Sequence, residues 1–256
     1  MAEMPSVELL TAFAAVPSGK EGKATGVSYQ ELVEAMKADP DVAAARLRAL
    51  LNHPKADVRA WACIAGAKAC GRIFVPTLLE AFSDRSQHVQ EMVVSGLLAI
   101  DPDAGLLRPL ILQMRPRLLK WEADGAARIA HILTRLDDAE AAPYMARYLA
   151  RKDVDRYQHQ RGEVYFVYLT EGLAGLLKRI RGHEDHALMA ILCEVAYAVD
   201  GPEVEPALKH LIETAPDERC RMIAQQTLEA LRLARAEGAP PYWNRRLTFK
   251  SLPRPG

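Results

Sequence analysis

The stretch Val75–Ala99, VPTLLEAFSDRSQHVQEMVVSGLLA, decides the predicted fold because it has the pattern of two helices joined by a short polar turn. In its second half, apolar residues stand 3, 4, 8 and 11 positions after Val89, and they are Met92, Val93, Leu97 and Ile100. That spacing follows one face of a helix with 3.6 residues per turn. In its first half, Pro76 suits the first turn of a helix, where its missing N–H has no intrahelical partner anyway.

The same proline position recurs along the chain. Pro109 and Pro143 follow Pro76 at steps of 33 and 34 residues, and Pro206 comes 63 residues later. The last step is close to two repeats, and Ala174 stands in the intermediate proline position. We therefore predict a helix pair that repeats every thirty-odd residues.

The second helix of the pair recurs as well. Val58 and Cys220 begin the same series of apolar positions as Val89. The residues one position later are Arg59, Gln90 and Arg221. We predict that the two arginines form a structural ladder bonded to neighbouring turns and do not form a binding site. A repeating helix pair cannot bury its apolar face alone, so successive pairs must stack.

Two segments, ADVRAWACIAGAKACG and DERCRMIAQQTLEAL, resemble the second helix of a HEAT repeat. The residues that carry the resemblance are Asp57, Val58, Arg59 and Ala62 in the first segment, and Asp217, Cys220, Arg221 and Ala224 in the second. The short period is similar to the bacterial HEAT-like subtype of phycobilisome-lyase-type repeats. The resemblance implies an all-α, right-handed superhelix of about six helix pairs, a HEAT-like solenoid over residues 41–237. Residues 1–40 would supply N-terminal helices, and residues 238–256 form a basic, proline-rich tail.

Composition narrows the function classes. Lysine plus arginine equals aspartate plus glutamate, 33 against 33, which argues against a dedicated nucleic-acid binder. Four cysteines form no C-x-x-C pair, which predicts buried free thiols in a reducing compartment. The N-terminal sequence MAEMPSVELL lacks a basic segment before an apolar run, and apolar runs such as VYFVYL are too short for a bilayer. We expect a soluble, cytoplasmic protein.

Two local signals near the N-terminus concern a loop and a helix start. Pro17–Gly26 predicts a mobile loop because it carries glycines and lysines without a large apolar residue. It does not fit a phosphate-binding loop, since Lys23 is followed by Ala24 and no strand precedes it. Asp41, directly after Pro40, is the predicted N-cap of the next helix.

One repeat breaks the pattern at DRYQHQRGEVYFVYL, residues 155–169. Polar residues crowd its first half: Arg156, Gln158, His159, Gln160, Arg161 and Glu163. Aromatic residues surround them: Tyr157, Tyr165, Phe166 and Tyr168. A break of this kind is typical of a functional site. The alternative is a slip in register, in which the helix begins only at Glu163 and QHQR is a solvated loop.

The sequence His183-Glu184-Asp185-His186 places two histidines at i, i+3 spacing, which could suit a shared metal ion. It stands at a predicted helix start, where acidic residues are favoured by free N–H groups, and no third ligand is near. We therefore expect a capping turn, and we predict no metal and no cofactor.

The predicted function is a non-catalytic scaffold or adaptor that binds a protein partner on the concave face of the solenoid. Second helices of HEAT-like pairs line that face, and its mixed charge suits a protein partner. The candidate binding residues come from two consecutive repeats: Trp121, Asp124, Arg128, Arg156, His159, Arg161 and Glu163.

Three alternatives stay open. Trp121, Asp124 and Arg128 resemble, by residue type, the set used by HEAT-like alkylpurine DNA glycosylases, which would imply a DNA-repair enzyme. The repeat subtype implies a bilin lyase or chaperone. A toxin-neutralising inhibitor would have the same sequence features as an adaptor. We also expect the aromatic residues of the C-terminal tail to dock on the last repeat.

Overall fold

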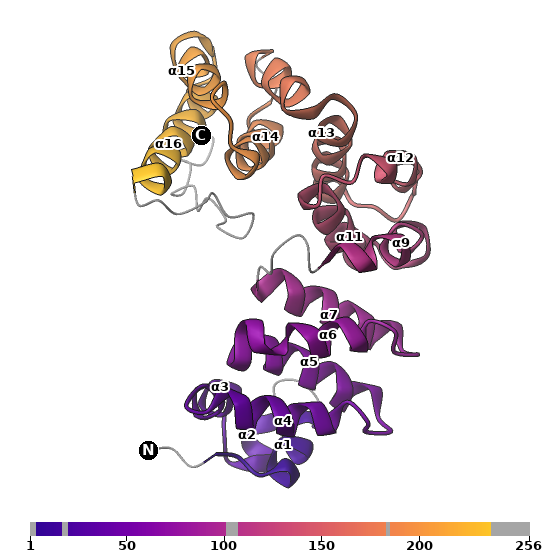
Figure 1. Ribbon diagram of the computed structural model, residues 1–256. Coiled ribbons are helices and arrows are strands. Elements are labelled where there is room, and N and C mark those ends of the chain that lie inside the picture. Colours follow the sequence, from indigo (N-terminus) through magenta and orange to yellow (C-terminus); the bar gives the residue numbers. More distant parts are fainter. Residues whose placement is uncertain (1–3, 17–19, 101–106, 183–184, 237–256) are drawn as a thin grey trace. The chain divides into compact units, whose positions relative to one another are not determined.

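The computed structural model describes residues 4–16, 20–100, 107–182 and 185–236, and the chain divides into two compact units, residues 1–110 and 111–256. All regular structure in the described ranges is helical, so the all-α prediction is confirmed (Figure 1). The division at residue 110 falls inside the array that the repeat pattern predicts as continuous. The predicted tail, residues 238–256, lies outside the described residues.

Unit 1 is built around one central helix. Its helices are α1 (Val7–Ala14), α2 (Glu21–Thr25), α3 (Tyr29–Lys37), α4 (Pro40–Leu50), α5 (Ala56–Cys70), α6 (Val75–Ala81) and α7 (Gln87–Ile100), with 3-10 turns at Gly71–Phe74 and Arg108–Leu110. Helix α5 packs against α3, α4 and α7 and also contacts α1. Leu47, Val58, Phe74 and Leu97 are fully buried in its core.

The polar ladder predicted from Arg59 and Arg221 is present, and Gln90 follows the same rule. The Arg59 Nη1 donates to the carbonyl oxygen of His53 at 2.8 Å, six residues back in the preceding turn. Gln90 Nε2 donates to Asp84 O at 2.5 Å and Arg221 Nη1 donates to Ala215 O at 2.5 Å, each again six residues back. Each side chain therefore ties the start of its helix to the turn before it.

Arg59 also joins two successive repeats. Its Nε and Nη2 donate to the two carboxylate oxygens of Asp84, at 2.7 and 2.9 Å, in the turn between α6 and α7. The Arg59 residue is only 5% exposed. In this pair, both partners are fixed by two parallel hydrogen bonds, the strong geometry for arginine and a carboxylate.

Two local predictions for unit 1 need correction. The N-cap of α4 is Asp39, whose side chain accepts from Val42 N at 3.2 Å, and not Asp41. Pro40 takes the first helical position, where its fixed φ suits a helix start, so the cap falls two residues earlier than predicted. Within the predicted loop Pro17–Gly26, residues 17–19 lie outside the described residues, and Glu21–Thr25 forms the short helix α2.

One apolar run is longer than the sequence patterns suggested. Ala56–Ala81 is long and apolar enough, by length and composition alone, to cross a membrane. Most of that run is buried inside unit 1, as the core helix of a folded protein would be. A 3-10 turn at Gly71–Phe74, where Gly71 has a φ of 56°, separates α5 from α6 within it.

Unit 2 contains α9 (Ile111–Met114), α10 (Arg117–Lys120), α11 (Ala123–Arg135), α12 (Ala142–Leu149), α13 (Arg156–Arg181), α14 (His186–Val199), α15 (Val204–Thr214) and α16 (Glu218–Ala236), with a 3-10 turn at Ala139–Ala141. Helices α11, α13, α14 and α16 form a second-helix row, in which each helix packs against the next. Helices α10 and α12 pack against one another, and α12 also packs against α13, which lies next to it in Figure 1. Pro116 separates α9 from α10, since α9 ends before it and α10 begins after it.

Helix α13 is two helices in sequence. Gly172 has a φ of 64° and a ψ of −161°, which interrupts the helical backbone between residues 156–171 and 173–181. Ala174, which stands in the intermediate proline position of the repeat pattern, therefore lies at the start of a separate helix. Residues 156–171 belong to the irregular repeat, and they contain the candidate site.

Candidate functional site

The irregular repeat is helical from its first polar residue. Helix α13 begins at Arg156, and the side chain of the N-cap Asp155 accepts from Gln158 N at 2.8 Å. The alternative in which the helix starts at Glu163 after a solvated loop is therefore wrong. An aspartate cap satisfies a free N–H of the first turn, so a polar sequence can enter a helix here. Residues 156–163 lie on the first two turns of α13.

Arg161 is the centre of a polar cluster formed with His131, Tyr157, Tyr165 and Glu194, which we call the Arg161 cluster. Its Nη1 donates to Tyr157 Oη at 2.9 Å and to Glu194 Oε2 at 3.1 Å. Its Nη2 donates to Tyr165 Oη at 2.7 Å and to Glu194 Oε1 at 3.3 Å, and its Nε reaches Tyr165 Oη at 3.2 Å. A guanidinium has five N–H groups, so all of them are committed inside the protein.

Tyr165 connects the guanidinium to α11. Its hydroxyl lies 2.8 Å from His131 Nδ1, and the residue is 2% exposed. The phenol oxygen accepts from Arg161 and carries one hydrogen of its own, and its contact with Nδ1 is a second hydrogen bond whose donor depends on the imidazole tautomer. Burial raises the pKa of Tyr165 to about 12, so the phenol keeps that hydrogen at neutral pH. The cluster thus joins three helices of the second-helix row: α11, α13 and α14.

Tyr157 is the exposed member of the cluster. The residue is 58% exposed, although its hydroxyl is held by Arg161 and the guanidinium carbon lies 5.7 Å from its ring centre. Arg161 and Tyr157 are one helical turn apart, the spacing at which side chains on a helix meet. An aromatic ring is therefore presented to solvent in a fixed orientation.

The other predicted residues lie close by on α11 and α13, with one exception. Asp124 is exposed in the first turn of α11 and accepts a hydrogen bond from Gln158 of α13. His159 and Glu163 approach to 3.6 Å along one face of α13, and Arg156 is exposed in its first turn. Arg128 is half-buried one turn after Asp124 on α11. The structure therefore brings six of the seven predicted residues onto two packed helices.

Trp121 is the exception. It lies before α11, in extended backbone at the end of α10, and it is only 4% exposed. Arg117 covers its ring, with the guanidinium carbon 5.7 Å from the ring centre. A tryptophan in this position packs the core and cannot stack on a base, so the set Trp121, Asp124 and Arg128 lacks its aromatic member.

Sequence reasoning did not single out Glu194 as a site residue. It is the one charged residue in the otherwise apolar segment ALMAILCEVAYAV of α14. A lone carboxylate in an apolar helix must find a partner, and this signal could have placed it opposite a cation. The partner could not be identified as Arg161 without the packing of α13 against α14.

The other residues with potentially reactive side chains, among them the four cysteines, form no second candidate site in the described ranges. The four cysteines are buried and free, as predicted, and burial raises the pKa of the Cys63 and Cys193 thiols to about 12. Thiols of that pKa are poor nucleophiles at neutral pH. Asp185 caps α14 by accepting from Ala187 N at 2.9 Å, which agrees with the predicted capping turn, while His183 and Glu184 lie outside the described residues. Across the described residues, no group of three His, Cys, Asp or Glu side chains could hold a metal ion.

The function of the chain is therefore inferred from the Arg161 cluster and its neighbours on α11 and α13. No protein-family model, curated protein or solved structure matches this chain.

Proposed function

We propose that this protein is a non-catalytic, cytoplasmic scaffold or adaptor, built as a HEAT-like solenoid, that binds a protein partner. Its binding surface is the exposed side of α11 and the first half of α13. Its candidate contact residues are Tyr157, Arg156, His159 and Glu163 of α13 and Asp124 of α11, all of them exposed or half-buried.

The single observation that carries this proposal is the fixed, exposed ring of Tyr157. Tyrosine is enriched among the residues that dominate binding energy at protein interfaces. A side chain already held in place loses less conformational freedom on binding, so more of its contact energy appears as affinity. The Arg161 guanidinium holds the ring by one hydrogen bond and by its position near the ring.

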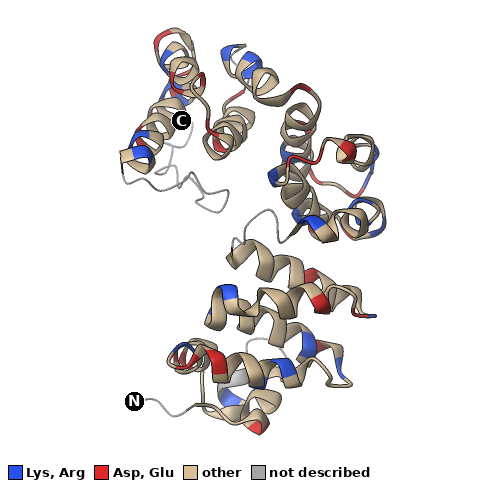
Figure 2. Cartoon of the chain, viewed as in Figure 1, with Lys and Arg blue, Asp and Glu red and all other residues tan. Residues whose placement is uncertain are grey.

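The mixed charge of α11 and the first half of α13 favours a protein partner over a polyanionic one. Arg156 and Glu163 lie on α13 and Asp124 lies on α11, so these two helices carry both positive and negative charges (Figure 2). A surface for duplex DNA would instead need a row of unpaired cations to neutralise phosphates. The buried Trp121 is a second argument against the repair-enzyme alternative.

The test is affinity purification with the full chain, comparing wild type, Tyr157→Ala and Leu112→Ala as baits. Leu112 of α9 is 74% exposed, so its replacement removes a similarly accessible side chain away from the cluster. We expect a partner that co-purifies with wild type and Leu112→Ala and is lost with Tyr157→Ala. Binding of the purified partner should weaken by about 2 kcal/mol or more, the usual cost at such an anchor.

Equal recovery of the same partners by all three baits would contradict the proposal. Arg161→Glu is a poorer test because it places a second carboxylate against Glu194 and disturbs the fold of the cluster. Nucleic acid that co-purifies at low salt and washes off at high salt would support the repair-enzyme alternative instead.

A further inference from the structure

A second surface of unit 2, formed by α9, α10 and α12, carries an excess of basic side chains, because the acidic residues beside it, Asp138, Glu140 and Asp153, pair with only two of them. Residues 111–121 and 141–152 contain six basic residues and no Asp or Glu, in a chain whose total charges balance. The six are Arg115, Arg117, Lys120, Arg147, Arg151 and Lys152. Such local excess on one surface creates a positive potential that the net charge of the protein conceals.

Two of these cations are neutralised within the fold. Arg115 donates to both carboxylate oxygens of Asp138, at 2.6 and 2.8 Å, and also pairs with Glu140. Arg151 pairs with Asp153 and donates through Nη1 to the carbonyl of Leu118 at 2.9 Å. The bond between Arg151 and Leu118 fixes the end of α12 against α10. The basic residues of the two helices therefore keep fixed positions relative to one another.

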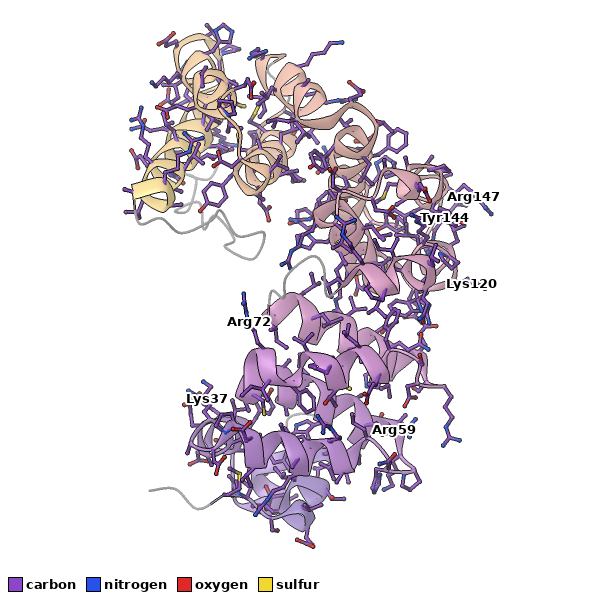
Figure 3. All side chains as sticks on the ribbon, viewed as in Figure 1. Lys37, Arg59, Arg72, Lys120, Tyr144 and Arg147 are labelled. Atoms are coloured by element: carbon purple, nitrogen blue, oxygen red, sulfur yellow. The ribbon has the colours of Figure 1, made fainter. Side chains whose placement is uncertain are left out.

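Lys120, Arg147 and Lys152 are different, because each is exposed and has no ion-pair partner among the described residues. Lys120 ends α10, and Arg147 lies on α12 one turn after the half-buried Tyr144. Lys120, Tyr144 and Arg147 project from the same side of unit 2 (Figure 3). We propose that this surface, centred on Lys120 and Arg147, binds an acidic peptide segment of a partner protein.

The size and chemistry of the surface favour carboxylates over a nucleic-acid backbone. Proteins that hold duplex DNA by its backbone make about 6–10 phosphate contacts, more than three unpaired cations can supply. Helix α12 has eight residues and is about 12 Å long, which matches a few residues of peptide. The Arg147 guanidinium can bind a carboxylate through two parallel N–H groups, while the Tyr144 ring offers an apolar contact beside it.

This surface shares no residue with the Tyr157 surface, so each proposal can be tested by substitutions that leave the residues of the other unchanged. The experiment measures fluorescence anisotropy of a labelled oligoglutamate peptide at low ionic strength with the full chain. The test variant is Lys120→Glu with Arg147→Glu. The matched control is Lys178→Glu with Arg181→Glu, which makes the same charge change at two exposed residues at the end of α13.

We expect wild type and the control variant to bind oligoglutamate with similar affinity, and the test variant to bind about tenfold more weakly. Circular dichroism melting should be unchanged in the test variant because both residues are exposed. Absence of binding by wild type, or an equal loss in both variants, would overturn the proposal. Tighter binding of a labelled DNA duplex that displaces oligoglutamate would also overturn it and would assign the surface to phosphates.

Discussion

At the scale of single residues, Arg161 is held by contacts within the fold. The sequence predicts it as a binding residue, but its five N–H groups are all used by Tyr157, Tyr165 and Glu194. Its side chain is 20% exposed and that of Glu194 is 21% exposed, so both charges have lost much of their hydration. Complete hydrogen bonding is what makes such a pair tolerable. In the proposed function, Arg161 positions Tyr157, and Tyr157 makes the contact with the partner.

The phenol oxygen of Tyr165 bonds to both Arg161 and His131, so its removal gives a prediction for a single residue. Tyr165→Phe removes the oxygen that accepts from Arg161 and bonds to His131, and it leaves buried donors unsatisfied. We expect the free energy of unfolding to fall by about 1–3 kcal/mol in urea denaturation. Tyr144→Phe is the matched control and should change it by less than about 0.5 kcal/mol. If the two variants are equally stable, the cluster contributes nothing to the fold.

At the scale of helices, Gly172 determines where one helix ends and the next begins. Its φ of 64° and ψ of −161° lie in a region that is essentially restricted to glycine. A Cβ atom added there would meet nothing within 4 Å, so any cost of substitution comes from the backbone alone. We expect Gly172→Ala to lower the free energy of unfolding of unit 2 by about 1–3 kcal/mol, measured by urea denaturation. A neutral substitution would mean that the two halves of α13 can join in one continuous helix.

Asp84 gives a prediction about pH at the same scale. The hydrogen bonds from Arg59 hold the pKa of Asp84 below its ordinary value. A carboxyl group with a depressed pKa stabilises the fold fully above its unfolded-state pKa, and this stability is lost as the pH falls through the lower folded-state pKa. Asp84→Ala should therefore cost about 3 kcal/mol at neutral pH. The difference from wild type should shrink as the pH falls below about 3.9.

The measurement is urea denaturation at neutral and acidic pH. The control is Asp57→Ala, since the Asp57 side chain is 83% exposed and stands 4.0 Å from His88 in the neighbouring helix. This control should stay within about 0.5 kcal/mol of wild type at both pH values. A constant difference between Asp84→Ala and wild type across the pH range would show that Asp84 acts by packing and not by charge.

The helices show what the sequence could and could not predict. Periodic apolar positions predicted the helix pairs, and the equal positions of Arg59 and Arg221 predicted the ladder, because both depend on local spacing. The N-cap of α4 was misplaced by two residues because Asp41, directly after Pro40, offered a competing signal. Six of the seven site residues share two packed helices, yet the burial of Trp121 could not be predicted. Burial depends on which helices pack together, and that information is not local.

At the scale of the molecule, the chain divides at residue 110 although its repeat pattern continues across that point. Each unit has its own buried core, with Leu47 and Phe74 in unit 1 and Leu176 and Leu192 in unit 2. A compact unit with its own core can open without the other. The chain should then behave as two cooperative units, even though the sequence presents one array.

Hydrogen exchange measured by mass spectrometry tests this, because peptides report on each unit separately. Asp84→Ala weakens unit 1, and we expect exchange of its core peptides to accelerate about a hundredfold, as a loss of about 3 kcal/mol predicts. Peptides from α13 and α14 should keep the wild-type rate. Gly172→Ala should produce the reverse pattern, faster exchange in α13 and α14 with α5 and α7 unchanged. If either variant accelerates exchange in both units by the same factor, the chain opens as a single cooperative body. The Arg161 cluster would then depend on the packing of unit 1 as much as on its own hydrogen bonds.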